Sequence, residues 1–143
     1  MSDTETKQTV STTIPTAVSA MGIGVSDLQT SAAFYRDLLG MRPVMDFKLA
    51  HMDEIILVAP LGGSAIVLMH WTDGSERNYK NLPIKIVVRT PDPAGLVAKI
   101  RDAGYTIVRD AVPAPEVGNA IVGFARDPDG YLIEILEPLP SAN

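Results

Sequence analysis

The chain has 143 residues, of which 46% are hydrophobic and 20% are charged, and its formal net charge is -5. This composition is typical of a globular domain with its own core, and an acidic balance without a cluster of Lys or Arg argues against a nucleic-acid-binding surface. The absence of cysteine excludes disulfides, thiolate catalysis and cysteine-based zinc sites.

The two ends of the chain read as tails around one domain. Residues 1–16 are polar and lack the basic and apolar regions of a secretory signal, so they predict a flexible tail. No stretch approaches the roughly 20 apolar residues that span a bilayer. We therefore expect a cytoplasmic protein without membrane contact, with its domain at 17–139 and a short tail at 140–143.

The first half of the domain, residues 17–72, predicts a strand at 17–25, a helix and three more strands. The opening strand has small residues at three alternate positions, namely Ala20, Gly22 and Gly24. Its bare face fits either close packing of a neighbouring element or room for a ligand. Ser26 or Asp27 caps a helix that ends at Gly40. The pattern of β-forming residues then predicts strands at 43–49, 54–60 and 64–71.

After a polar linker at 73–82, the same pattern repeats over 83–139. A strand at 84–90 leads to a helix that begins at Asp92 and Pro93 and ends at Gly104, 64 positions after Gly40. Three strands follow, at 106–112, 119–127 and 131–138. The repeat predicts an α+β fold of two βαβββ modules, whose curved mixed sheets surround a cavity.

Three segments carry a family resemblance. GVSDLQTSAAFYRDLLGM at 24–41 resembles the first-helix signature of the vicinal oxygen chelate superfamily, FARDPDGYLIEILEP at 124–138 is similar to its last hairpin, and the second helix also fits. That superfamily includes glyoxalase I, methylmalonyl-CoA epimerase, extradiol dioxygenases and the bleomycin- and fosfomycin-resistance proteins. The resemblance covers 17–139 and is specific for the fold, which hosts many reactions.

The resemblance also implies where a metal would bind. Metal-dependent members hold a divalent cation with four inward-facing residues, and the matching positions here are Ala20, Leu68, Lys85 and Glu134. Ala and Leu have no donor atom and the ammonium of Lys85 repels a cation, so only Glu134 keeps a ligand. We therefore expect no metal cofactor. A shifted metal site built from His70 and Glu134 would need further ligands.

Glu134, Lys85 and His70 are the candidate catalytic residues. In the family geometry Lys85 and Glu134 occupy inward positions of adjoining strands, where they form either a structural ion pair or a base with a cation that stabilises an oxyanion. Strand alternation places His70 on the face of Leu68, where it acts as an acid or base or merely bonds a loop. Arg89 shares the face of Lys85 and would guide an anionic ligand.

Substrate contacts are predicted for Arg89, Trp71, Leu68, Ala20 and Phe47, although core packing is the simpler role for each apolar residue. The favoured function is a metal-independent lyase, isomerase or cyclase that acts on a small carbonyl-containing metabolite. The first alternative is a non-catalytic protein that sequesters a ligand, as bleomycin-resistance proteins do. The second is a glyoxalase or dioxygenase with a shifted metal site. Family members of this size pair, which predicts a homodimer.

Overall fold

The computed structural model describes residues 13–139, so the predicted tails lie outside the described residues except for 13–16. The first module runs from β1 to β4. Its elements are β1 (Ala20–Gly24), α2 (Leu28–Ala33), the π-helical turn η1 (Phe34–Leu38), β2 (Arg42–Lys48), β3 (Met52–Val58) and β4 (Ala65–Trp71). The predicted single helix is thus an α-helix capped by Asp27 that continues as a π turn.

The second module repeats this order after the linker. Its elements are β5 (Lys85–Arg89), α3 (Pro93–Asp102), β6 (Ile107–Ala114), the short 3-10 turn η2 (Pro115–Val117), β7 (Ala120–Arg126) and β8 (Leu132–Leu136). Asp92 caps α3 by accepting a bond from the backbone N–H of Gly95, with proline at the first helical position. The predicted βαβββ repeat is confirmed.

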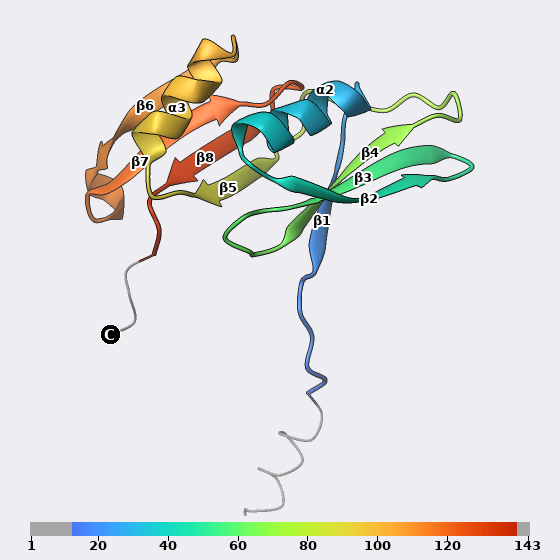
Figure 1. The fold of residues 1–143 in the computed structure, drawn as a ribbon, viewed down its shortest axis with the longest axis horizontal. Helices are drawn as coiled ribbons and strands as arrows, with labels where there is room; N and C mark the ends of the chain where they lie inside the picture. The colour runs from blue at the N-terminus through green and yellow to red at the C-terminus, as the bar shows by residue number, and fades with distance from the viewer. Residues whose placement is uncertain (1–12, 140–143) are drawn as a thin grey trace, which may run out of the picture.

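Each module forms a four-stranded mixed sheet. The strand order is β1-β4-β3-β2 in the first sheet and β5-β8-β7-β6 in the second. β1 runs parallel to β4, β5 runs parallel to β8, and the other pairs are antiparallel. Both helices lie on the same side of the sheets, and the two sheets stand next to each other (Figure 1). We call the sheet faces opposite the helices the open faces.

The core lies between the sheets and the helices. Alternate residues of the central strands face the helices and are almost fully buried, among them Leu57, Leu68, Ile133 and Ile135. Phe34 links the modules by packing edge-on against Tyr105, with ring centroids 5.0 Å apart. No helix in residues 13–139 is long and apolar enough to cross a membrane.

One turn of the second module is bonded to the first module. The turn before β8 contains Asp127 and Asp129, both buried. Asp127 accepts a bond from the hydroxyl of Tyr35 at 2.7 Å, and Asp129 accepts one from the backbone N–H of Ser26 at 3.0 Å and a second from its hydroxyl. Tyr131 donates its hydroxyl to the carbonyl of Gly24 at 2.7 Å. These bonds fix the modules relative to each other.

Burial also changes the acidity of this cluster. It raises the pKa of the Asp127 carboxyl above its ordinary value, against the lowering effect of the bond from Tyr35. The pKa of Tyr35 is raised well above its ordinary value by burial and by the neighbouring Asp127. Burial, with Asp129 and Asp127 adding to it, raises the pKa of Tyr131 to about 12. At neutral pH both tyrosines are therefore protonated donors.

Candidate functional site

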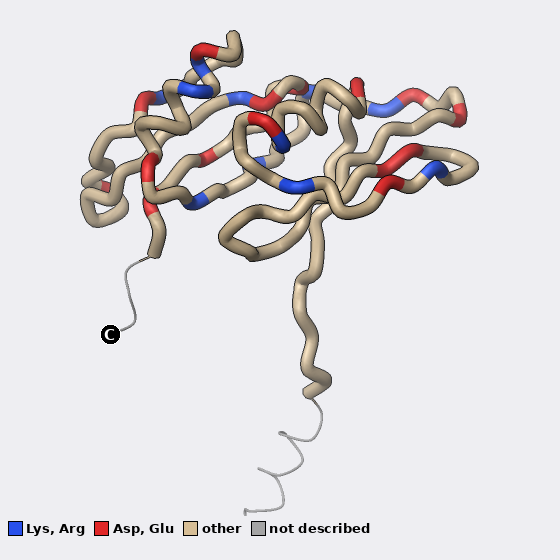
Figure 2. Tube along the Cα trace, in the orientation of Figure 1, with Lys and Arg blue, Asp and Glu red and all other residues tan. Residues whose placement is uncertain are grey.

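The open face of the second sheet carries the predicted catalytic pair. Strand alternation places Glu134 on this face with Leu132 and Leu136 as its neighbours along β8, while Ile133 and Ile135 face the core. On β5 the same face has Lys85, Val87 and Arg89, so that a basic residue stands at each end of the strand (Figure 2). In register, Glu134 lies between Val87 and Phe124.

Lys85 and Glu134 form an ion pair. The Nζ of Lys85 is 2.7 Å from the Oε1 of Glu134, although the backbone register pairs Lys85 with Leu132. The ammonium therefore reaches diagonally along the sheet. The side chain of Glu134 is only 15% exposed and that of Lys85 is 51% exposed. A ligand on the open face can thus reach the ammonium directly, while the carboxylate stays partly shielded from water.

The open face of the first sheet is apolar and rich in methionine. It carries three residues of β4, namely Val67, Met69 and Trp71, and Phe47 of β2. The register partner of Phe47 is Glu54, the one acidic residue that β3 contributes to this face. The bare face of β1 is filled from within the chain. A side-chain carbon added at Gly22 would meet Met69 at 3.0 Å, and one added at Gly24 would meet the ring of Tyr79 at 3.2 Å. Close packing thus accounts for these glycines.

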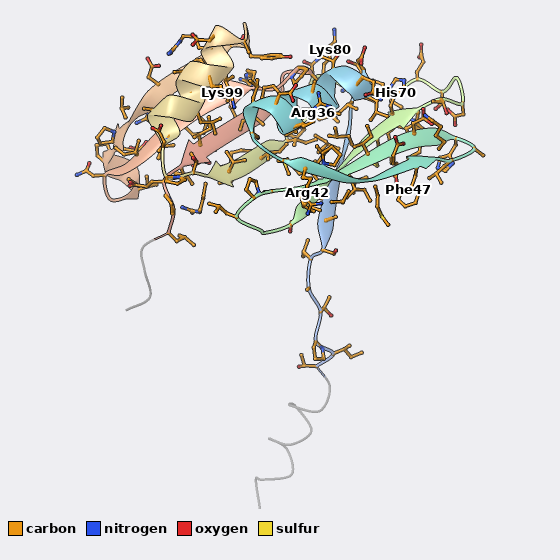
Figure 3. All side chains as sticks on the ribbon, viewed as in Figure 1. Arg36, Arg42, Phe47, His70, Lys80 and Lys99 are labelled. Atoms are coloured by element: carbon orange, nitrogen blue, oxygen red, sulfur yellow. The ribbon has the colours of Figure 1, made fainter. Side chains whose placement is uncertain are left out.

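Two predicted placements are wrong. Leu68 is completely buried on the helix side, in the core, and its neighbour Val67 lies on the open face instead. His70 shares the face of Leu68 and therefore also points to the helix side, where its Nδ1 lies 2.9 Å from the carbonyl oxygen of Val25. Figure 3 shows His70 and Phe47 on opposite sides of the first sheet. The structure does not bring His70 to the Lys85–Glu134 pair.

The segment between the modules is folded against the end of the first sheet. The ring of Tyr79 stacks on His70, and its hydroxyl accepts a bond from the backbone N–H of Trp71 at 3.2 Å. The guanidinium of Arg77 lies 4.4 Å from the centre of the Trp71 ring, a cation–π contact. Trp71 thus lies at the edge of the open face, partly covered by Tyr79 and Arg77. The sequence alone did not indicate these two contacts.

The residues present do not fit a divalent metal. On the open face of the first sheet, the side chains of Ala20 and Val67 have no atom that could bind a metal. In the second sheet, the carboxylate of Glu134 is already paired with the ammonium of Lys85. Within residues 13–139, no group of three or more His, Asp or Glu side chains is arranged to hold a metal ion. Because Leu68 faces the core, Val67 is the residue of β4 at the implied ligand position. This changes nothing for the metal, because both side chains are hydrocarbons.

The candidate site is an open surface. Two hollows of about 550 and 340 Å³ lie elsewhere, one along Ser75–Tyr79 and one between α2 and β2, and neither is lined by Glu134 or Lys85. Apolar residues on both open faces are exposed to solvent: Met45 by 53%, Val87 by 47%, Val112 by 40% and Phe47 by 38%. The predicted cavity is therefore not enclosed by the described part of one chain.

Comparison with known proteins gives consistent results. The model of the Glyoxalase/Bleomycin resistance protein/Dioxygenase superfamily matches residues 16–135. The lactoylglutathione lyase of Salmonella typhimurium is 31% identical over 79% of this chain and 86% of its own length. A probable lactoylglutathione lyase of Synechocystis is also 31% identical, over 80% of this chain and 90% of its own.

Solved structures share the fold. Glyoxalase I of Leishmania major superposes with a TM-score of 0.71 at 24% identity, covering 86% of this chain and 87% of that one. An antibiotic binding protein from Streptomyces sp. CB03234 superposes with a TM-score of 0.70 at 19% identity, covering 89% and 99%. One enzyme and one binding protein thus have the same architecture, so the function must be argued from the site.

Proposed function

Since this chain belongs to the Glyoxalase/Bleomycin resistance protein/Dioxygenase superfamily, we propose that it is an enzyme that acts on a small carbonyl compound without a metal ion. The observation that carries this proposal is the ion pair of Lys85 and Glu134, with 2.7 Å between Nζ and Oε1. It places a carboxylate and a fixed cation side by side on an apolar, accessible face. The lyase names of the relatives that are 31% identical support a catalytic role.

The proposed reaction is proton abstraction next to a carbonyl group. The carbonyl oxygen displaces Glu134 from the ammonium of Lys85, and the freed carboxylate takes the proton from the adjacent carbon. The C–H bond breaks, its electron pair forms a C=C bond, the π pair of the carbonyl group moves to the oxygen, and the ammonium stabilises the resulting enolate. Return of the proton to the opposite face of the same carbon gives an epimer. If that carbon carries a hydroxyl group, protonation of the neighbouring carbon of the enediolate, with loss of the hydroxyl proton, gives an isomer. Loss of a leaving group from the next carbon gives a lyase.

We further propose that a second copy of the chain covers the open faces, which makes the working protein a homodimer. Exposed Met45 and Phe47 on the first sheet, and Val87 on the second, are apolar surface that one chain leaves in water. The charges are complementary as well, since Glu54 is on the first open face and Lys85 and Arg89 are on the second. Covering these faces would shield the reacting groups from water.

The test measures exchange of carbon-bound protons in D₂O. Pyruvate, hydroxyacetone and methylglyoxal are followed by NMR with wild type and Glu134→Gln. Glu116→Gln is the control with the same charge change, at a side chain that is 64% exposed. We expect exchange in the presence of EDTA for at least one compound, and a loss of about 100-fold or more in Glu134→Gln only. Formation of lactoylglutathione, after which the relatives are named, is assayed in parallel.

Two results would overturn the proposal. Activity that EDTA abolishes and a divalent metal restores would show a metal enzyme, and elemental analysis of protein purified without chelators would then find about one metal per chain. Full activity in Glu134→Gln would remove the proposed base.

A binding protein is the second candidate, and one observation favours it. The open face of the first sheet carries Met45 and Met69, residues whose unbranched side chains suit surfaces that accept varied ligands, and a neighbour with the same fold is an antibiotic binding protein. This candidate predicts no exchange with any carbonyl compound, together with saturable quenching of Trp71 fluorescence by an apolar ligand.

A further inference from the structure

The amino end of β8 is flanked by two basic residues on the open face of the second sheet. Leu132 is in register with Lys85 on one side and with Arg126 of β7 on the other. Neighbouring strands are about 4.8 Å apart, so the two basic residues start roughly 10 Å from each other. Leu132 forms an apolar floor between them, and Glu134 follows two residues later on the same face.

Arg126 has no carboxylate partner within residues 13–139, as is also true of Arg42, Arg77 and Arg89, whereas three other arginines are paired. Arg36 is paired with Asp37, Arg101 with Asp110 and Arg109 with Glu116. The Nη1 of Arg126 instead donates to the carbonyl of Gly130 at 3.2 Å, which orients the guanidinium and leaves its other N–H groups available. A guanidinium held in this way is prepared to bind a carboxylate through two parallel bonds.

We propose that the substrate carries a carboxylate group, which Arg126 binds at the amino end of β8, next to the Lys85–Glu134 pair. Arg126 is a specificity-determining residue that touches the substrate and takes no part in proton transfer. This inference rests on the proposed carbonyl chemistry of Glu134 and Lys85, and it defines the substrate class as oxo acids. Sequence reasoning considered Arg89 for an anion and did not consider Arg126.

The charges of this face favour the end with Arg126 over the end with Arg89. Arg89 is in register with Leu136 and then with Val122, so it is the only basic residue in its row. Arg89 and Arg126 each donate to a backbone carbonyl just outside β8, that of Glu137 at 2.9 Å and that of Gly130 at 3.2 Å, so the difference between the two ends is the second basic residue, Lys85. At the other end Lys85 and Arg126 together exceed the single negative charge of Glu134. A bound carboxylate would balance these charges, whereas a neutral ketone would leave one cation without a partner.

The position of Arg126 relative to Glu134 also suits an oxo acid. Glu134 is two residues from Leu132, a distance of about 6.6 Å along the strand. In this proposal a carboxylate bound by Arg126 would leave the adjoining carbonyl facing the ammonium of Lys85 and the next carbon facing Glu134, because these two side chains lie together on the carboxyl-terminal side of Leu132. In pyruvate this next carbon is the methyl group, whose protons exchange through an enol. In hydroxyacetone the same arrangement lacks the anchoring charge.

The experiment compares the two compounds, pyruvate and neutral hydroxyacetone, in D₂O. Exchange is followed with wild type, Arg126→Gln, Arg126→Lys and the control Arg101→Gln, whose side chain lies on α3 on the far side of the sheet. We expect Arg126→Gln to lower kcat/KM for pyruvate by about tenfold or more, mainly through KM, because a charge-assisted bond is lost. Hydroxyacetone should be unaffected, and Arg126→Lys should recover part of the loss.

A binding measurement separates this inference from the proposed function. The dissociation constant of pyruvate is measured by NMR titration for wild type, Arg126→Gln and Glu134→Gln. Binding that depends on Arg126, without any exchange in wild type, would refute the catalytic proposal and keep the carboxylate site. Equal losses for pyruvate and hydroxyacetone in Arg126→Gln, or unchanged pyruvate affinity, would overturn the carboxylate site and leave the base in place.

Discussion

The hydroxyl of Tyr35 donates a hydrogen bond of 2.7 Å to Oδ2 of Asp127, which joins the π turn of the first module to the last turn of the second. Tyr35 is fully buried and Asp127 is 3% exposed. Tyr35→Phe leaves the buried carboxylate without one donor, and we expect the free energy of unfolding to fall by about 1–3 kcal/mol. Urea denaturation at pH 7 measures this loss. Tyr105→Phe is the control, because that ring packs on Phe34 and a similar loss there would contradict the importance of the bond.

Alkaline pH should weaken the protein through the buried tyrosines. The pKa of Tyr131 in the folded protein is about 12, above its ordinary value of 10.0, so the unfolded chain releases this proton first. Stability is then fully present below pH 10 and falls as the pH rises toward 12. Tyr131→Phe should be less stable than wild type at pH 7, because it lacks the bond to Gly24, and should lose stability less steeply above pH 10. Parallel slopes in urea titrations of the two proteins would count against this prediction.

The assignment of faces on β4 can be tested with one charged residue at two adjacent positions. Leu68→Glu places a carboxylate in the core without a partner, and we expect it to prevent folding or to cost several kcal/mol. Val67→Glu places the same carboxylate on the open face, so it should still fold and lose much less stability than Leu68→Glu, although it should weaken the dimer. Thermal unfolding followed by circular dichroism decides the matter, and the reverse order would show that Leu68 faces the open side after all.

Self-association should depend on the open faces. We expect sedimentation to give about twice the chain mass of 15.3 kDa for wild type. Val87→Asp adds a charge to an exposed apolar position of β5, and it should shift the equilibrium toward the monomer without unfolding the chain. Val117→Asp is a matched control at a similarly exposed valine of the turn η2, outside both sheets. A wild-type protein that stays monomeric at every concentration would disprove the dimer.

The order of elements could be predicted from the sequence because its signals are local. Gly40 and Gly104 have positive φ values of 72° and 94° and stand just beyond the helical segments, as their spacing of one repeat indicated. Asp92 and Pro93 likewise mark the start of α3 through interactions with their immediate neighbours. Such signals need no knowledge of tertiary contacts.

The sequence could not predict which residues of β4 face the core, because this strand is apolar on both faces. Val67 and Leu68 are both hydrophobic, so the alternation that usually separates core from surface is missing, and a shift of one residue moves His70 to the other side.

The partners of Asp127 and Asp129 could not be predicted for a different reason. Their turn chemistry was clear, yet the partners that bury them, Tyr35 and Ser26, are 92 and 103 residues away. Only the packed modules bring these groups together.

The bonds of the last turn have a consequence for the order in which the protein acquires its structure during synthesis. Gly24 and Tyr35 leave the ribosome early, whereas their partners Tyr131 and Asp127 are made 107 and 92 residues later. At about 5–20 residues per second, this delay is on the order of 5–20 s. During that interval the first module lacks the bonds that hold β1 and the π turn, and its apolar open face is available to other chains. A nascent chain stalled before residue 127 should therefore be a preferred substrate for chaperones.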